Sequence, residues 1–381
     1  MHKLTFFPLG NADCCRIDLS GGEKLLFDYA AVKDASDNAD KRIDLSAELR
    51  EDLEASKRDY YDVVAFTHLD DDHIHGATDF FYLQHAAKYQ GDGRIKIKKL
   101  WVPAAVIIED GCEDEARVLQ EEARHRLREG KDILVFSRPD KLKDWLDKEG
   151  LTIENRANCV IDAGKTVPDF TQNKQGVEFF VHSPFGSRLD DGTLVDRNID
   201  CIVVQASFLA DQKVTKVILA SDVDHVALRE IVKVTKFHKR EDRLEWDVLK
   251  LPHHCSYLSL GPDKGKDKTT PVEEVKWLLE DQAQTGATIV SPSKRIPGND
   301  DDIQPPHRQA ENYHKDAAKG AKGEFIVTME HPKERAPEPL EMRLGRQKRK
   351  SRSATGVVQS PPLAIRLPVQ AHERLHLNRR A

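Results

Sequence analysis

The sequence predicts an α/β protein in which two β-sheets are covered by helices. Apolar, β-rich runs recur in both halves of the chain, and segments with a helical pattern lie between them. Several of the apolar runs end on aspartate or histidine. Because chemistry in α/β folds is usually placed at the ends of strands, the pattern that predicts the fold also predicts where a site lies.

The first half of the chain alternates short strands with helices. Strands are expected at residues 3–7, 13–18, 24–28, 61–67 and 95–106. Helices are expected at residues 41–57, where leucines recur every four positions, and at 77–89. Residues 105–175 contain two strongly charged helical stretches and are expected to form a mainly helical insertion.

The strand pattern returns after the insertion and continues almost to residue 330. Strands are expected at residues 177–181, 201–208, 216–220, 246–251, 287–290 and 324–329, with helices at 271–281 and 311–318. We therefore expect one domain over residues 1–331 and a basic, disordered tail over 332–381, where Pro, Arg, Lys and Ser dominate. Residues 333–381 carry a formal charge of about +8, which leaves about −14 on the rest.

Composition excludes several classes of protein. With 39% hydrophobic and 33% charged residues, the chain can bury a core. The six cysteines form no CxxC pair, which argues against a zinc finger and favours buried thiols. No apolar run is long enough for a signal peptide or for a membrane span of roughly 18 to 20 residues. A cytoplasmic protein without membrane contact is expected.

A dense polar cluster follows the apolar strand expected at 61–67. Its sequence, HLDDDHIHG, begins at His68, and the carboxylates crowded in it repel one another unless a cation neutralises them. His68 and Asp70 share a face if the strand end stays extended, and Asp72 and His73 follow where the chain turns into a helix. Imidazole and carboxylate are ligands for zinc and manganese, and two such pairs predict two adjacent ions. The alternative is a charged loop that caps the next helix.

The cluster resembles the HxHxDH signature of the metallo-β-lactamase superfamily, with Asp70 in place of the second histidine. In that respect it resembles HxDxDHxxG, the motif of the nuclease-like domain of the competence (ComEC-like) DNA-uptake proteins. Further segments are similar to that branch in the same order: PLGNADC at 8–14, LLFDYA near Asp28, ILASDVD with Asp222, and DVLKLPHHCS with His253 and His254. The resemblance implies an αββα sandwich and a metal centre.

The resemblance implies that Asp222 bridges two metals, although a helix cap is the simpler alternative. Of the adjacent histidines, His253 is expected as a ligand and His254 as the proton donor to the leaving oxygen, and these roles could be exchanged. Asp72 is expected to be both a ligand and a catalytic residue. Cys255 stands where that branch has glycine, which leaves the loop shape open.

Other polar residues are candidates for substrate contacts or for supporting the ligands. Asn198 and His307 are candidate substrate contacts, each weighed against a plain turn or surface residue. His182 is an alternative source of the missing imidazole. Asp28 and His75 are expected to support the ligands from outside, and Asp13 is either a structural loop residue or such a supporting acid. The candidate residues for phosphate contacts are Lys294, Arg295 and those of the basic tail.

The sequence therefore predicts a hydrolase with two divalent ions, zinc or manganese, that acts on nucleic acid or another phosphodiester. The phosphodiester rests on the resemblance alone, because the same kind of centre opens lactones and amides and cleaves thioesters. A small-molecule hydrolase of that kind is the second hypothesis. A non-catalytic, metal-stabilised binding module is the third.

Overall fold

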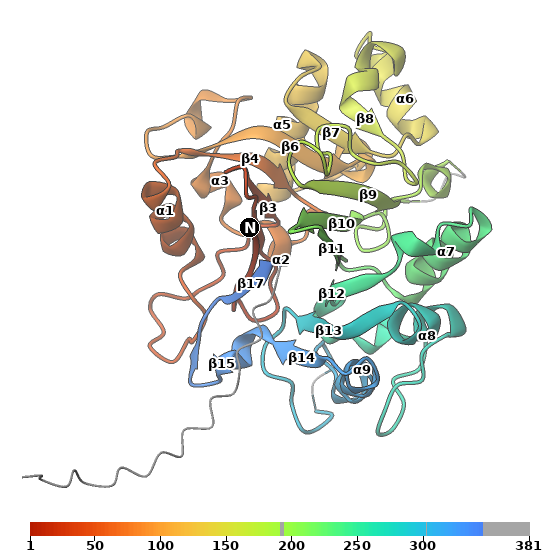
Figure 1. The fold of residues 1–381 in the computed structure, drawn as a ribbon. Coiled ribbons are helices and arrows are strands. Elements are labelled where there is room, and N and C mark those ends of the chain that lie inside the picture. Colours follow the sequence, from red (N-terminus) through yellow and green to blue (C-terminus); the bar gives the residue numbers. More distant parts are fainter. Residues whose placement is uncertain (191–193, 302, 346–381) are drawn as a thin grey trace, which may run out of the picture. The chain divides into compact units, whose positions relative to one another are not determined.

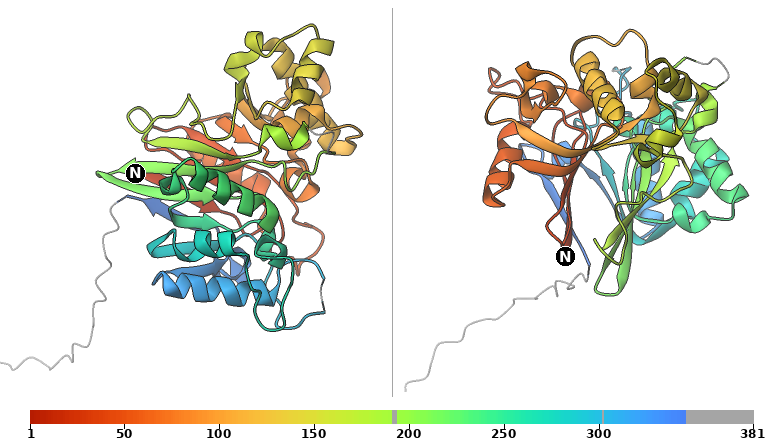
Figure 2. Two further views of the ribbon diagram at one scale, coloured as in Figure 1. Left: turned by 90° about the vertical axis from the view of Figure 1, so that its right-hand side faces the viewer. Right: turned by 90° about the horizontal axis from the view of Figure 1, so that it is seen from above.

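The computed structural model describes residues 1–190, 194–301 and 303–345. Two β-sheets pack face to face, and helices cover the outer face of each (Figure 1). The views in Figure 2 show the helices on opposite sides of the paired sheets. The predicted αββα sandwich, the layer order of the metallo-β-lactamase fold, is confirmed.

The first sheet joins the N-terminal strands to the end of the described chain. Its order is β17-β1-β2-β3-β4-β6-β7-β8, and β5 pairs with β6. The strands are β1 (His2–Phe6), β2 (Cys15–Asp18), β3 (Lys24–Phe27), β4 (Tyr60–Ala65), β5 (Phe81–Tyr82), β6 (Ile95–Pro103), β7 (Ile133–Phe136), β8 (Val160–Ile161) and β17 (Leu340–Leu344). Pairing is antiparallel from β17 to β3 and parallel from β3 to β8. Parallel pairing brings the carboxyl ends of β3 and β4 together.

The second sheet is formed by the other half of the chain. Its order is β14-β13-β12-β11-β10-β9. The strands are β9 (Val177–Ser183), β10 (Val203–Ala210), β11 (Lys213–Leu219), β12 (Trp246–Lys250), β13 (Ala283–Ser291) and β14 (Glu324–Val327). Strands β11 to β14 are parallel neighbours, so the carboxyl ends of β11 and β12 also meet at one edge.

Helices are divided between the two outer layers. Those on the first sheet are α1 (Leu45–Ala55), α2 (Asp71–Ile74), α3 (Ala77–Phe80), α4 (Ala104–Ile108), α5 (Asp114–Glu129) and α6 (Asp140–Lys148). Those on the second are α7 (His225–Phe237), α8 (Glu273–Glu280) and α9 (Arg308–Gly320). Among the described residues, no helix is long and apolar enough to cross a membrane.

The central core lies between the sheets and follows from strand alternation. On β4, Val63 faces this core, whereas its neighbour Val64 faces the outer helices. Aromatic rings fill the centre: the ring centroid of Phe179 in the second sheet lies 5.4 Å from Trp101 and 6.1 Å from Phe27 in the first. Both faces of each sheet are therefore buried, which is why its central strands read as continuous apolar runs.

The predicted helical insertion at 105–175 needs correction. It does contain α5 and α6, but it also contributes β7 and β8 to the edge of the first sheet. The sequence ILVF at 133–136 is fully buried and pairs in parallel with the end of β6. Four residues are too few to reveal a strand period between two charged helices. The segment therefore extends the sheet.

The predicted boundary of the tail at 332 is also wrong. Residues 332–345 contain β15 (Pro332–Lys333), β16 (Ala336–Pro337) and β17, and β17 pairs with β1. On β17, Leu340 and Leu344 are buried while Glu341 is exposed and pairs with Lys3 at 2.7 Å. The sheet therefore continues beyond residue 331. The rest of the predicted tail, 346–381, lies outside the described residues.

A buried histidine in the outer layer predicts a pH-dependent stability. His314 on α9 is 2% exposed, and burial lowers its pKa to about 3. Because its pKa is lower in the folded than in the unfolded chain, stability is lost as the pH falls below about 6.5. At pH 5 we expect His314 to cost about 2 kcal/mol of unfolding free energy relative to pH 7.

The measurement is urea unfolding of His314→Leu at both pH values. The loss of stability between pH 7 and pH 5 should be about 2 kcal/mol smaller than in the unaltered protein. The exposed His238 provides the matched control, and His238→Leu should leave the pH dependence unchanged. An unchanged pH dependence in His314→Leu would show that this histidine is protonated without penalty in the folded state.

Candidate metal centre

Five segments next to the ends of strands in both sheets supply the site. The loop before β2 carries Asp13, and the end of β3 carries Asp28. The turn after β4 leads through α2, which contains His73. From the second sheet, Asp222 follows β11 and His254 follows β12. The parallel pairing of β3 with β4 and of β11 with β12 brings the carboxyl ends of these strands together within each sheet.

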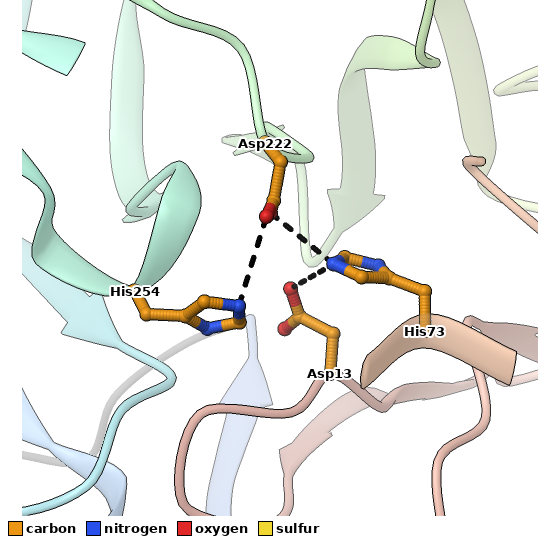
Figure 3. Close-up of side chains that lie close together, drawn as sticks. All are labelled: Asp13, His73, Asp222 and His254. Carbon is orange, nitrogen blue, oxygen red and sulfur yellow. Dashed lines mark ion pairs between the residues drawn. The ribbon is translucent and has the colours of Figure 1, made fainter. Parts of the chain in front are cut away.

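Four buried side chains converge between the sheets: Asp13, His73, Asp222 and His254 (Figure 3). The Nε2 atom of His73 lies 3.2 Å from Asp222 Oδ1 and 3.6 Å from Asp13 Oδ2. The Nε2 atom of His254 lies 3.7 Å from Asp222 Oδ2 and 3.0 Å from Asp72 Oδ2. One ligand atom from each of the four lies within 4.8 Å of all the others, a spacing that allows them to hold one metal ion.

A second group overlaps the first. It consists of His68, Asp72 and His73, whose ligand atoms also lie within 4.8 Å of one another. His73 belongs to both groups. Because the Nε2 atom of a neutral imidazole has a single lone pair, His73 can serve only one ion, and the first group has the fuller donor set.

Each of the three imidazoles is held by its Nδ1 atom, which leaves Nε2 toward the acids. His73 Nδ1 donates to Asp28 Oδ2 at 2.9 Å, and His254 Nδ1 donates to the Pro292 carbonyl at 2.7 Å. His68 Nδ1 lies 3.1 Å from Ser221 Oγ. A proton on Nδ1 leaves the Nε2 lone pair for a ligand, and such an outer partner is the usual companion of a metal-binding histidine.

Asp28 orients two of these rings. It accepts hydrogen bonds from His73 Nδ1, from Thr67 Oγ1 and from the Thr67 backbone N–H. The single proton of Thr67 Oγ1 is donated to Asp28, so the Ser221 hydroxyl, 2.7 Å from Thr67 Oγ1, must donate to Thr67. Because the Ser221 proton is then used, His68 Nδ1 donates to Ser221 Oγ. The predicted supporting place of Asp28 agrees with these contacts.

Charge in the group is unbalanced without a cation. Burial opposes protonation of His73, yet the carboxylates of Asp222 and Asp28 outweigh it and raise the pKa of His73 well above its usual value. Burial likewise opposes ionisation of Asp222, but the imidazoles of His73 and His254 hold its pKa well below the usual range. The acids thus draw a positive charge into the group, the charge that a divalent ion brings.

Unpartnered atoms mark the centre of the group. Four buried atoms there have no hydrogen-bond partner: Asp13 Oδ1, His68 Nε2, His73 Nε2 and Asp222 Oδ1. An unpaired buried polar atom costs about 1–3 kcal/mol, and the 3.2 Å ion pair between His73 Nε2 and Asp222 Oδ1 offsets only part of that loss. Imidazole nitrogen and carboxylate oxygen are the donors that zinc and manganese take, so the residues present fit such an ion.

The choice between the adjacent histidines needs correction. His253, Cys255 and the residue between them all have positive φ, and this left-handed turn sends the second imidazole inward. His254 is buried in the group, whereas His253 is half-buried and belongs to neither group. The two rings are perpendicular, with centroids 6.2 Å apart. The two adjacent side chains diverge, and the one that points into the group of ligand atoms is His254.

Asp70 is placed differently from the prediction. It belongs to neither group, and its Oδ1 accepts a hydrogen bond from Arg197 at 2.9 Å. Its other oxygen lies 3.5 Å from His68 Nε2. Burial opposes ionisation of Asp70, but His68 and Arg197 outweigh it and lower its pKa to about 2. The side chain is 37% exposed and lies at the rim of the group.

The remaining candidates lie outside the two groups. Asn198 follows Arg197 in the loop that contacts Asp70, and no described contact joins its side chain to the groups. His182 Nε2 contacts the Arg243 carbonyl at 2.8 Å, and this histidine belongs to neither group.

Two further histidines support the surrounding chain. His307 is buried, and its Nδ1 accepts the Tyr257 backbone N–H at 3.3 Å, so it supports the turn after the paired histidines. His75 pairs with the exposed Asp71 at the surface, where its Nδ1 lies 3.0 Å from Asp71 Oδ1. It has no described contact with the ligands that it was expected to support.

Two basic residues at the site were missed in the sequence. Lys250 ends the buried strand β12 and contacts Asp13, and Arg197 joins Asp70 to Glu109. A lysine within the apolar run WDVLKL was a signal, because an isolated buried charge requires a partner. Arg197 gave no such signal, since it stands in a polar loop.

Comparison with known proteins gives no family. No family model and no curated protein matches the sequence significantly. Igni18, described as a novel metallo hydrolase from the hyperthermophilic archaeon Ignicoccus hospitalis, is similar over 90% of this chain and 98% of its own, with 15% identity and a TM-score of 0.37. A structure described as a new diphosphatase from the PhnP family has the same coverage, 10% identity and a TM-score of 0.32. Values this low assign neither family nor activity.

Proposed function

We propose that the protein is a metal-dependent hydrolase that cleaves phosphodiester bonds. The observation that carries the proposal is the common orientation of three imidazoles. His68, His73 and His254 are each held at Nδ1; His73 and His254 present Nε2 to the buried Asp222, and His68 presents it to Asp70 at the rim. A helix cap or a surface loop requires no such arrangement, whereas metal ligands do.

The first ion is assigned to His73, Asp222 and His254, with Asp72 beside them. The predicted second ion would have His68 and Asp72 as ligands, and Asp70 could add its Oδ2, which lies 3.5 Å from His68 Nε2, while its Oδ1 stays bound to Arg197. The donor set is rich in oxygen, which favours manganese alongside zinc. Elemental analysis of the purified protein gives the identity and number of ions.

A divalent ion in this place supplies a hydrolytic nucleophile at neutral pH and stabilises negative charge on the reacting group. The protein's own part is to hold the imidazoles in one tautomer and to exclude water from their outer nitrogens. Because His254 Nδ1 donates to the Pro292 carbonyl and Nε2 faces the acids, His254 is better suited to bind an ion than to release a proton. The half-buried His253 is the candidate proton donor to the leaving oxygen.

The substrate class rests on the resemblance of HxDxDHxxG and the later segments to the competence-protein nuclease domain. Nucleic acid is the polymer that this resemblance implies. Arg295 is 67% exposed, with an ion pair of 3.1 Å to Glu334, and remains a candidate contact for a phosphate backbone.

A substrate panel tests the proposal. The protein, loaded in turn with Zn²⁺ and Mn²⁺, is assayed on bis-p-nitrophenyl phosphate, single- and double-stranded DNA, a lactone, a thioester and a β-lactam. We expect turnover of the phosphodiesters, and its loss with a chelator. Turnover of only the lactone, thioester or lactam would replace the phosphodiesterase with a small-molecule hydrolase.

A further inference from the structure

A buried lysine lies beside the proposed metal ligands. Lys250 is the last residue of β12 and is 5% exposed. Its Nζ donates to Asp13 Oδ2 at 2.7 Å and to the Ala220 carbonyl at 2.8 Å. A buried ammonium group has a large desolvation cost, which an apolar residue at this position would avoid.

Asp13 is fixed at two points. Its backbone N–H donates to the Asp72 carbonyl at 2.9 Å, and its Oδ2 is held by Lys250. The carboxylate points toward His73 and lies in the same group as Asp222 and His254 (Figure 3). Its other oxygen, Oδ1, is buried and has no hydrogen-bond partner. The oxygen that Lys250 holds, Oδ2, is also the one that lies 3.6 Å from His73 Nε2, so the lysine fixes the oxygen that faces the ligand group.

Lys24 is the other buried lysine with carboxylate partners, and it lies in a different place from Lys250. Lys24 begins β3, at the end of the strand opposite Asp28, and lies 2.6 Å from Asp18 and 2.8 Å from Asp52. Neither of these acids belongs to a described group of ligand atoms. Lys24 thus stabilises the surface of the first sheet, whereas Lys250 joins the second sheet to a member of the ligand group.

We propose that Asp13 is a carboxylate ligand of the metal centre and that Lys250 is the residue that positions it. This inference rests on the proposed metal centre. Lys250 fixes the rotation of the carboxylate through its hydrogen bond to Oδ2. It acts through Asp13, and no direct part in the reaction is assigned to it. The missing imidazole of the motif is then replaced by an oxygen ligand from the N-terminal loop.

Cobalt binding provides the test, because Co²⁺ reports the ligand set by its visible absorption without any assay of activity. Apo-protein is titrated with Co²⁺ for the unaltered chain, Lys250→Met, Lys250→Arg, Asp13→Asn, the double variant Asp13→Asn/Lys250→Met, and Lys24→Met as the matched control. We expect Lys250→Met to bind Co²⁺ about 10- to 100-fold more weakly with an altered spectrum. Lys24→Met should match the unaltered chain.

If Lys250 affects metal binding only through Asp13, the double variant has a predictable affinity. The double variant should bind Co²⁺ no more weakly than Asp13→Asn alone, because the lysine has nothing left to position. Lys250→Arg, which keeps the charge, should retain most of the affinity. Additive losses, or an unaltered affinity and spectrum in Lys250→Met, would overturn the proposal. If circular dichroism shows that Lys250→Met does not fold, the proposal fails when Lys250→Arg binds no better than Asp13→Asn.

The unaltered chain separates this inference from the proposed function. If it binds no Co²⁺, Zn²⁺ or Mn²⁺, the metal centre itself is wrong. If it binds Co²⁺ and the Lys250 variants bind equally well, only the role of Lys250 is wrong.

Discussion

Asp72→Asn is expected to lower kcat/KM for the substrate found in the panel by about 10³-fold, which corresponds to about 4 kcal/mol of transition-state stabilisation. Asp72 Oδ2 lies 3.0 Å from His254 Nε2, and the residue belongs to a group of ligand atoms. Asparagine has nearly the same shape but brings no negative charge to balance an ion. The measurements are kcat/KM and the metal content of the purified variant.

The neighbouring residue provides a matched control. Asp71 has a side chain that is 79% exposed and contacts His75 at the surface. Asp71→Asn makes the same chemical change one residue away and should leave kcat/KM unaltered, because Asp71 belongs to a separate, largely exposed group with His75 and Glu115. Asp222→Asn should behave as Asp72→Asn does, because Asp222 is buried in the group. Equal effects of the changes at positions 71 and 72 would mean that the motif acts through its overall charge, without a defined centre.

The fold was largely predictable because strands buried on both faces leave continuous apolar runs in the sequence. The run at 61–67 and the six runs of the second sheet were recognised in this way. Among the strands that were missed, β7, β8 and β17 are short, and β7 and β17 pair with strands that are distant in the sequence. Pairing of that kind is decided by tertiary contacts, which local periodicity does not show.

The site was predictable where histidine and aspartate residues directly follow a strand that the sequence shows. Four of the residues brought together, namely His68, Asp72, His73 and Asp222, were named from motif and position. The selection of His254 over its neighbour depends on three consecutive left-handed residues, which no motif encodes. Asp13 depends on a lysine 237 positions away, so its place in the group could not be read locally.

Metal removal is expected to lower the stability of the protein markedly. An ion that binds the folded state at a thousand times its dissociation constant contributes about 4 kcal/mol by mass action, and its removal should lower Tm by roughly 5–10 °C. The physical reason is a crowded set of acids, of which Asp13 and Asp222 are buried and Asp72 is half-buried. Asp13, Asp72 and Asp222 repel one another when no cation is present. Thermal melts of the Zn²⁺-loaded and the chelator-treated protein provide the measurement.

The variants show whether this stabilisation comes from the proposed centre and whether the centre is catalytic. The difference in Tm between loaded and stripped protein should nearly vanish in Asp222→Asn and persist in Asp71→Asn. Equal Tm values for loaded and stripped protein of the unaltered sequence would contradict the centre. A large difference in Tm, together with no turnover on any substrate of the panel, would leave the metal as a structural element and would identify the protein as a metal-stabilised binding module.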